Sequence, residues 1–273
     1  MRLTWKIFWI HKAGNSPEDY EDAYGFNAQG RSFAIADGAS EASFAGIWAR
    51  RLVEGFTASP FFCHGCSYQS LQRRLRPMQE AWHRAINWEE LPFYAEEKAQ
   101  AGAYAAFLGL QFDPSLKDSG PPIVGGWHAM AVGDCCLFQV RDNTIVESFP
   151  LQQPNAFNNS PALLSSLPQK NQRLWEESRV IFYQQGCAGR IWVNDLFILT
   201  TDALGEWFLR QSETVDHCDS KDRHPPWRIL NDLSSPGQFE ELVQELRRQK
   251  LLRNDDTTLI IIKVLLEESL EDT

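Results

Sequence analysis

Acidic residues stand beside strand-like apolar runs at four separate places in this chain. The four segments read EDAYGF, FAIADGAS, LFILTTDAL and NDDTTLIIIKV, and they contain Asp22, Asp37, Asp202 and the pair Asp255 and Asp256. Carboxylates that gather at strand ends raise one another's pKa, and they stay ionised together only where cations neutralise them. Because these ligands are all oxygen atoms, Mg²⁺ or Mn²⁺ is favoured over zinc or copper. The sequence therefore predicts a site for hard divalent cations.

The overall composition limits the kinds of partner. With 273 residues and 43% hydrophobic content, the chain can bury a substantial core, and no break in composition divides residues 1–273 into two domains. The net charge of −10 argues against a protein that binds a phosphate backbone. The apolar stretch from Ile7 to Ile10 is too short for a signal peptide, and the other apolar runs have strand length. We expect a cytoplasmic protein with no nucleic-acid or membrane partner.

The six cysteines are expected to be free thiols, since no export signal is recognised. Cys63 and Cys66 have the spacing of half a zinc site or of a redox pair. The other half is missing, because the His217-Cys218 pair has no second partner at the required spacing. A surface loop is the favoured interpretation of this segment.

The first part of the chain reads as strands followed by two long helices. We expect Ser40 to cap the first helix, and Pro77 to kink or divide the second. The expected strands are 3–10, 23–27 and 32–36, and the expected helices are 41–56 and 68–88.

From Gly102 onward, short strands follow one another without intervening helices, which predicts antiparallel pairing. Residues 150–195 include an irregular, Pro- and Asn-rich excursion that resembles a flap. The expected strands are 103–112, 127–134, 135–142, 144–150, 180–184, 196–200 and 257–266, and the expected helices are 204–211 and 238–249. Runs of strands flanked by helices predict an α+β fold, a four-layer α-β-β-α sandwich with two antiparallel sheets.

Five motifs in a fixed order carry a resemblance to a known family. They are FAIADGAS, the glycine-alanine strand at 102–107, AVGD, LTTDALGEW and NDDTTLIII. In this order the chain resembles the bacterial branch of the metal-dependent 2C-type (PPM) protein serine/threonine phosphatases, from about Ala13 to Val264. The family's paired antiparallel sheets between helices agree with the fold expected from the residues.

The resemblance implies a role for individual residues. Asp37 would bridge two metal ions, the carbonyl of Gly38 would bind the second ion, and Asp202 and Asp255 would bind the first. Glu21 and Asp22 match the acidic pair that orients metal-bound water. Asp134 and Glu206 occupy positions that can bind a third, weaker metal in bacterial relatives. Two ions in such a site activate water for direct attack on phosphorus, without a phosphoenzyme.

The chain departs from the family pattern at three positions. Ala203 stands where the family usually has glycine, and its methyl group could crowd the turn beside the metal. Ala39 replaces a histidine of some eukaryotic members, so the leaving serine would take its proton from water or another group. The family's phosphate-binding arginine has no clear match, and Lys12 is the nearest candidate. Among the histidines, His11 is close enough in sequence to approach the site.

The implied activity is that of a hydrolase in signalling, which removes phosphate from serine or threonine with two Mn²⁺ or Mg²⁺ ions. Its partner would be a phosphorylated protein, either a cognate serine/threonine kinase or that kinase's target. Ala203 and the missing arginine favour an alternative, a catalytically weak or silent relative that binds phosphoproteins and regulates them. A third hypothesis is a metal-dependent hydrolase of small phosphoesters. The two catalytically active hypotheses can be distinguished by whether the protein hydrolyses a phosphopeptide or a small phosphoester.

Overall fold

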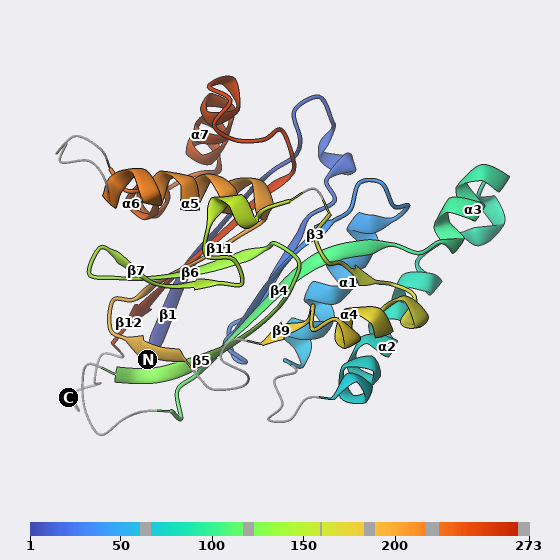
Figure 1. The fold of residues 1–273 in the computed structure, drawn as a ribbon, viewed down its shortest axis with the longest axis horizontal. Coiled ribbons are helices and arrows are strands. Elements are labelled where there is room, and N and C mark those ends of the chain that lie inside the picture. Colours follow the sequence, from blue (N-terminus) through green and yellow to red (C-terminus); the bar gives the residue numbers. More distant parts are fainter. Residues whose placement is uncertain (61–66, 117–122, 159, 183–188, 217–223, 267–273) are drawn as a thin grey trace, which may run out of the picture.

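Two antiparallel sheets face one another, and helices cover their outer faces, which confirms the predicted α-β-β-α sandwich (Figure 1). The computed structural model describes residues 1–60, 67–116, 123–158, 160–182, 189–216 and 224–266. Every strand pair between these residues is antiparallel. None of the helices in these ranges is long and apolar enough to cross a membrane.

The first sheet has five strands in the order β1-β12-β11-β6-β7. Their bounds are β1 (Arg2–Ile10), β12 (Thr257–Leu265), β11 (Leu196–Thr200), β6 (Cys136–Arg141) and β7 (Thr144–Phe149). The second sheet has the order β10-β5-β4-β3-β2, with β8 added to β4 and β9 to β5. Its strands are β2 (Ala23–Asn27), β3 (Ser32–Gly38), β4 (Tyr104–Asp113), β5 (Ile123–Val132), β8 (Leu164–Ser165), β9 (Ile181–Phe182) and β10 (Gly189–Trp192).

The helices lie in two groups. The first group packs on the second sheet and includes α1 (Ala45–Ala58) and α2 (Tyr68–Arg84). The second group packs on the first sheet and consists of α5 (Asp202–Asp216), α6 (Pro226–Asp232) and α7 (Pro236–Arg248). The remaining helices are α3 (Phe93–Gln100), α4 (Gln172–Glu176) and the short 3-10 turns η1 (Pro17–Asp19), η2 (Trp88–Glu90), η3 (Pro154–Ala156) and η4 (Pro168–Lys170).

Strands in the middle of each sheet are apolar on both faces, because one face meets the other sheet and one meets helices. In β12, Ile260 and Ile262 pack between the sheets, whereas Leu259 and Ile261 pack with α5, α6 and α7. The same alternation occurs in the second sheet, where Phe33 and Ile35 point inward and Ala34 and Ala36 meet α1. This two-sided burial fixes the register, since a shift by one residue would exchange the two faces.

The structure corrects several expected boundaries. The first helix begins at Ala45, not at residue 41, and its N-cap is Phe44 in a left-handed conformation, so the predicted Ser40 cap is wrong. α2 runs through Pro77 as one helix, ends at Arg84 and is not divided. α3, α6 and β10 have no counterpart among the expected elements. Cys63 and Cys66 lie outside the described residues, while Cys135 and Cys136 are confirmed as free, buried thiols.

The excursion predicted at 150–195 consists of short elements within the described residues. Part of it is fixed to the helices beside it, because the indole of Trp48 donates to the Leu164 carbonyl at 2.9 Å. The Asn171 side chain closes a local turn by accepting from Ser165 N and donating to Ser165 O, at 2.7 and 2.8 Å. A flap function for this segment stays a prediction.

Candidate functional site

The antiparallel register brings the predicted acidic residues to one end of the sandwich. Asp37 is the penultimate residue of β3, and Asp22 precedes β2, whose first residue pairs with the residue before Asp37. Asp202 opens α5 directly after β11, Asp255 precedes β12, and Asp134 lies between β5 and β6. These strand ends adjoin one another in the two sheets. We call Asp22, Asp37, Asp134, Asp202 and Asp255 the carboxylate cluster.

All four other members of the carboxylate cluster act electrostatically on Asp37. Burial raises its pKa well above the ordinary value, and the charges of Asp22, Asp202, Asp134 and Asp255 raise it further. The residue still keeps part of its surface accessible to solvent. A carboxylate that is open on one side and surrounded by like charges is a suitable ligand for a cation.

Asp22 joins the cluster to both sheets. Its Oδ2 accepts a hydrogen bond from Thr258 Oγ1 of β12 at 2.6 Å, and the Thr258 hydroxyl is also 2.5 Å from the Tyr20 hydroxyl. Its Oδ1 is buried and has no hydrogen-bond partner among the described residues. Burial raises the pKa of Asp22 well above the ordinary value, and the charges of Asp256 and Asp202 add to the effect.

Asp256 has a structural role that could not be read from the sequence. Its two carboxylate oxygens accept from the backbone amides of Lys12 and Glu21, at 2.7 and 2.6 Å. The Asn254 side chain bonds both backbone groups of Ala13, at 2.8 and 3.1 Å. The loop before β12 is thereby fixed to the connection between β1 and β2, which carries Lys12 and Glu21.

Glu21 and Gly38, for which the sequence predicts water-orienting and metal-binding roles, lie next to each other in the structure. Burial raises the pKa of Glu21, and a hydrogen bond with Ser40 opposes this effect. A side chain at Gly38 would have its Cβ 2.7 Å from the Glu21 carbonyl oxygen and 2.9 Å from a backbone atom of Ala45. Glycine is therefore required here by the close approach of two backbone segments.

Lys12 and Arg253 form ion pairs with members of the carboxylate cluster. Lys12 Nζ lies 3.9 Å from Asp255 Oδ1, so the predicted phosphate-binding lysine is near the site. Arg253 donates from Nη2 to Asp202 Oδ2 at 2.6 Å, and its Nε lies 3.2 Å from Glu206 Oε2 in an ion pair. The sequence prediction missed Arg253, and its only signal was a basic residue two positions before Asp255. His11 makes a local contact, with Nδ1 3.0 Å from the Lys12 carbonyl oxygen.

Asp134 is buried, and its pKa is raised to about 7. Burial is the main cause, and the negative charge of Asp202 contributes, while the positive charge of Arg253 acts in the opposite direction. Ala203, whose methyl group was expected to crowd the turn beside the site, is buried. It lies in the apolar cluster beneath α5 and does not have a positive φ.

The donor atoms fit a hard divalent cation in their chemistry, because the cluster offers only carboxylate oxygens, one of them buried and unpartnered at Asp22. Among the residues that the structure describes, no group of three or more histidine, cysteine or acidic side chains could hold a metal ion as placed. The ligand roles predicted for Asp37, Gly38, Asp202 and Asp255 therefore stay predictions.

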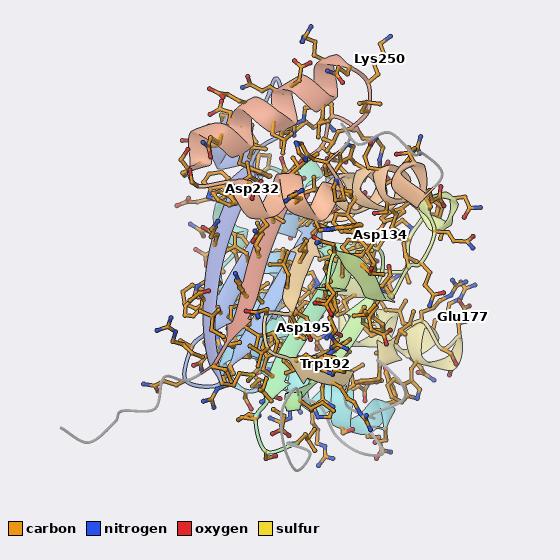
Figure 2. The ribbon with its side chains drawn as sticks, turned by 90° about the vertical axis from the view of Figure 1, so that its left-hand side faces the viewer. Asp134, Glu177, Trp192, Asp195, Asp232 and Lys250 are labelled. Atoms are coloured by element: carbon orange, nitrogen blue, oxygen red, sulfur yellow. The ribbon has the colours of Figure 1, made fainter. Side chains whose placement is uncertain are left out.

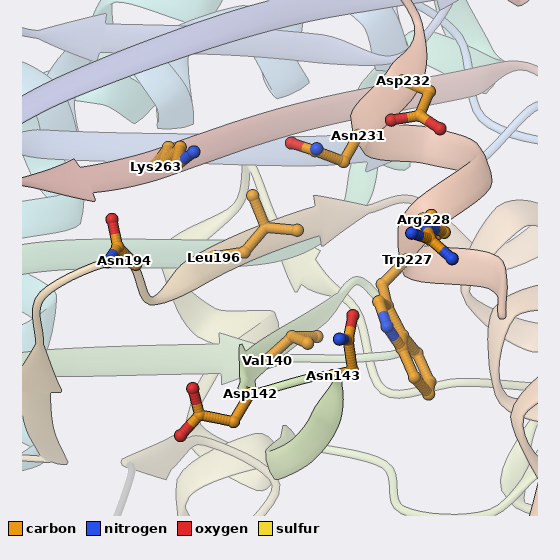
Figure 3. Close-up of a pocket in the computed structure, with 10 residues that line it drawn as sticks. All are labelled: Val140, Asp142, Asn143, Asn194, Leu196, Trp227, Arg228, Asn231, Asp232 and Lys263. Carbon is orange, nitrogen blue, oxygen red and sulfur yellow. The ribbon is translucent and has the colours of Figure 1, made fainter.

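Two other polar features lie away from the cluster. A cavity of about 350 Å³ opens between α6 and the ends of β6, β11 and β12 in the first sheet, with Trp227, Asn231, Asn143 and Lys263 among its lining residues (Figure 3). At the same end of the sheets, the buried Asp195 lies near Trp192, well apart from Asp134 (Figure 2). No residue of the carboxylate cluster lines this cavity.

A scan against protein-family models and a search of the curated proteins found no match. The fold is nevertheless similar to solved phosphatase structures. The serine/threonine phosphatase PstP/Ppp of Mycobacterium tuberculosis aligns with a TM-score of 0.55 and 12% identity, over 97% of this chain and 100% of that one. Stp1 of Staphylococcus aureus aligns with a TM-score of 0.55 and 13% identity, over 98% and 96%.

A PstP catalytic domain in complex with two manganese ions aligns with a TM-score of 0.54 and 12% identity, over 97% and 99%. The similarity thus covers nearly all of each chain, although the sequences have diverged widely. The chain has the fold of the PPM-type serine/threonine phosphatases, and the resemblance expected from the motifs is confirmed at the level of the fold.

Proposed function

We propose that the chain is a metal-dependent protein serine/threonine phosphatase that hydrolyses phosphoserine or phosphothreonine on a partner protein. The convergence of the carboxylate cluster at one end of a phosphatase fold is the observation that carries the proposal. The two manganese ions of the PstP catalytic domain support the expected use of two Mn²⁺ or Mg²⁺ ions. The partner would be a phosphorylated protein, either a cognate kinase or its target.

In this proposal, Asp37, the Gly38 carbonyl, Asp202 and Asp255 would hold the ions, and Glu21 and Asp22 would orient water. The bound cations would supply Lewis acidity, which activates water and neutralises the phosphoryl oxygens. The chain contributes carboxylates at the ends of hydrogen-bonded strands, where they lie close to one another.

Lys12 would add a positive charge beside the phosphoryl group. Its ammonium is less than half exposed and already faces the Asp255 carboxylate. A single lysine binds phosphate as a point charge and lacks the two-pronged geometry of an arginine.

Arg253 and Lys12 favour a second candidate function, a catalytically silent module that binds phosphoproteins. These two side chains already neutralise part of the charge on Asp202 and Asp255 without any metal. The active hypothesis is preferred because none of the ion pairs among the described residues involves Asp22 or Asp37. A module that only binds would have no use for two uncompensated acids.

The test measures hydrolysis of p-nitrophenyl phosphate and of a phosphothreonine peptide. The wild type is assayed with Mn²⁺ and with EDTA, and the Asp37→Asn variant is assayed with Mn²⁺. Metal-dependent turnover that Asp37→Asn abolishes is expected, and Asp232→Asn, an exposed residue at the end of α6, serves as the control. Turnover of the small ester alone would favour the small-phosphoester hydrolase. Absence of turnover with metal bound would refute the catalytic proposal and leave the silent module.

A further inference from the structure

One guanidinium group bridges two carboxylates on the same face of α5. Asp202 and Glu206 are four residues apart, which places their side chains one above the other on the helix. Arg253 reaches both from the loop before β12, with distances of 2.6 Å to Asp202 and 3.2 Å to Glu206. The Asp202 and Glu206 side chains are largely buried, whereas that of Arg253 is 42% exposed.

The positive charge of Arg253 extends to a third acid. It opposes the rise in the pKa of Asp134, and it acts on Asp202 in the same way. We call Asp134, Asp202 and Glu206 the acidic corner. The other cation nearby is Arg210, which pairs with Glu206 Oε1 from an exposed position one turn further along α5.

A divalent ion in this corner would need the oxygens that Arg253 occupies. Asp202 Oδ2 accepts from Arg253, and Asp202 Oδ1 accepts from the backbone amide of Ala203. A metal ion and a guanidinium group cannot share the same oxygen lone pairs, and their positive charges repel each other. Binding of Arg253 and binding of a metal ion at Asp202 are therefore in competition.

We propose that Arg253 is a resident cation that closes the acidic corner to divalent metal and weakens metal binding at Asp202. The inference rests on the proposed metal-dependent function, since it concerns the same carboxylates. It departs from the expectation that Asp134 and Glu206 bind a third metal, because the arginine takes that place. A charged hydrogen-bonded pair of this kind corresponds to about a 10- to 100-fold effect on metal affinity.

The experiment measures Mn²⁺ binding to the full chain by titration calorimetry, with the bound metal counted by elemental analysis. The wild type is compared with Arg253→Gln and with the control Arg210→Gln, which removes the other partner of Glu206. Arg253→Gln should bind one more Mn²⁺ or bind Mn²⁺ at least about 10-fold more tightly. Arg210→Gln should behave as the wild type, and Arg253→Lys, which keeps the charge but cannot bridge both acids, should be intermediate.

The inference is overturned if Arg253→Gln binds Mn²⁺ with unchanged or lower stoichiometry and affinity, or if Arg210→Gln changes binding as much. Phosphopeptide turnover is recorded on the same samples. Turnover by the wild type, combined with unchanged metal binding in Arg253→Gln, refutes the inference and leaves the proposed function intact. Tighter Mn²⁺ binding in Arg253→Gln without turnover by any variant supports the inference and refutes the function.

Discussion

Replacing Asp134 with asparagine should make the metal-free protein more stable at neutral and alkaline pH. The pKa of the folded-state carboxyl is about 7, whereas its ordinary value is 3.8. Because the pKa is raised on folding, this carboxyl costs nothing below about pH 4, and its cost rises with pH until the folded-state pKa is passed. The rise in the pKa from 3.8 to about 7 corresponds to a loss of unfolding free energy of about 4 kcal/mol at most, reached above pH 7.

The assay is urea unfolding in EDTA, for the wild type and Asp134→Asn, at about pH 5 and about pH 8. The gain in unfolding free energy of the variant should be larger at the higher pH by about 2.5 kcal/mol. Comparing two pH values removes the constant effect of exchanging an oxygen for an amide group. Asp232→Asn, which removes a charge from an exposed site, is the control. A gain that is the same at both pH values would refute the argument.

Three further predictions concern other parts of the molecule. Arg141→Ala should lower the unfolding free energy by about 3–5 kcal/mol in urea, because the fully buried Asp195 loses its charged partner and keeps only the hydrogen bonds from Gln139 and the Trp192 amide, and a loss below about 1 kcal/mol would contradict this. Gly109→Ala should cost about 1–3 kcal/mol in the same assay, since its Cβ would lie 2.5 Å from the Phe56 ring, and an unchanged midpoint would be the contrary result. Lys12→Ala should raise the KM for a phosphothreonine peptide about 2- to 5-fold without weakening Mn²⁺ binding, and an unchanged KM would remove Lys12 from the site.

Strand bounds could be predicted both for β11, which is buried on both faces, and for β2, an edge strand that alternates between more and less buried residues. The predicted strands at 23–27 and 196–200 have the bounds that the structure shows for β2 and β11. The first residues of helices were harder to predict than the bounds of strands, because they depend on local contacts. Ser40 has the chemistry of a helix cap, yet the chain forms turns after it and α1 begins five residues later, at Ala45.

Acidic site residues could be predicted because the strands that carry them could be predicted. Their partners could not, since a loop determines which cation reaches which acid. Arg253 is 51 positions from Asp202 in sequence, and only the path of the loop before β12 brings them together. The sequence also does not distinguish the roles of Asp255 and Asp256. The structure does, because Asp256 accepts hydrogen bonds from two backbone amides.

The rigidity that positions the carboxylate cluster also determines what can stabilise it. Asp37 cannot move away from Asp22, because β3 is hydrogen-bonded to β2 on one side and β4 on the other. The repulsion must therefore be reduced by positive charge from protons or divalent ions, while Arg253 already occupies one oxygen of Asp202 in the same cluster. Added Mn²⁺ should accordingly stabilise Arg253→Gln at about pH 8 more than it stabilises the wild type at about pH 5. An equal stabilisation in both cases, measured by thermal unfolding, would mean that the three kinds of charge act at separate places.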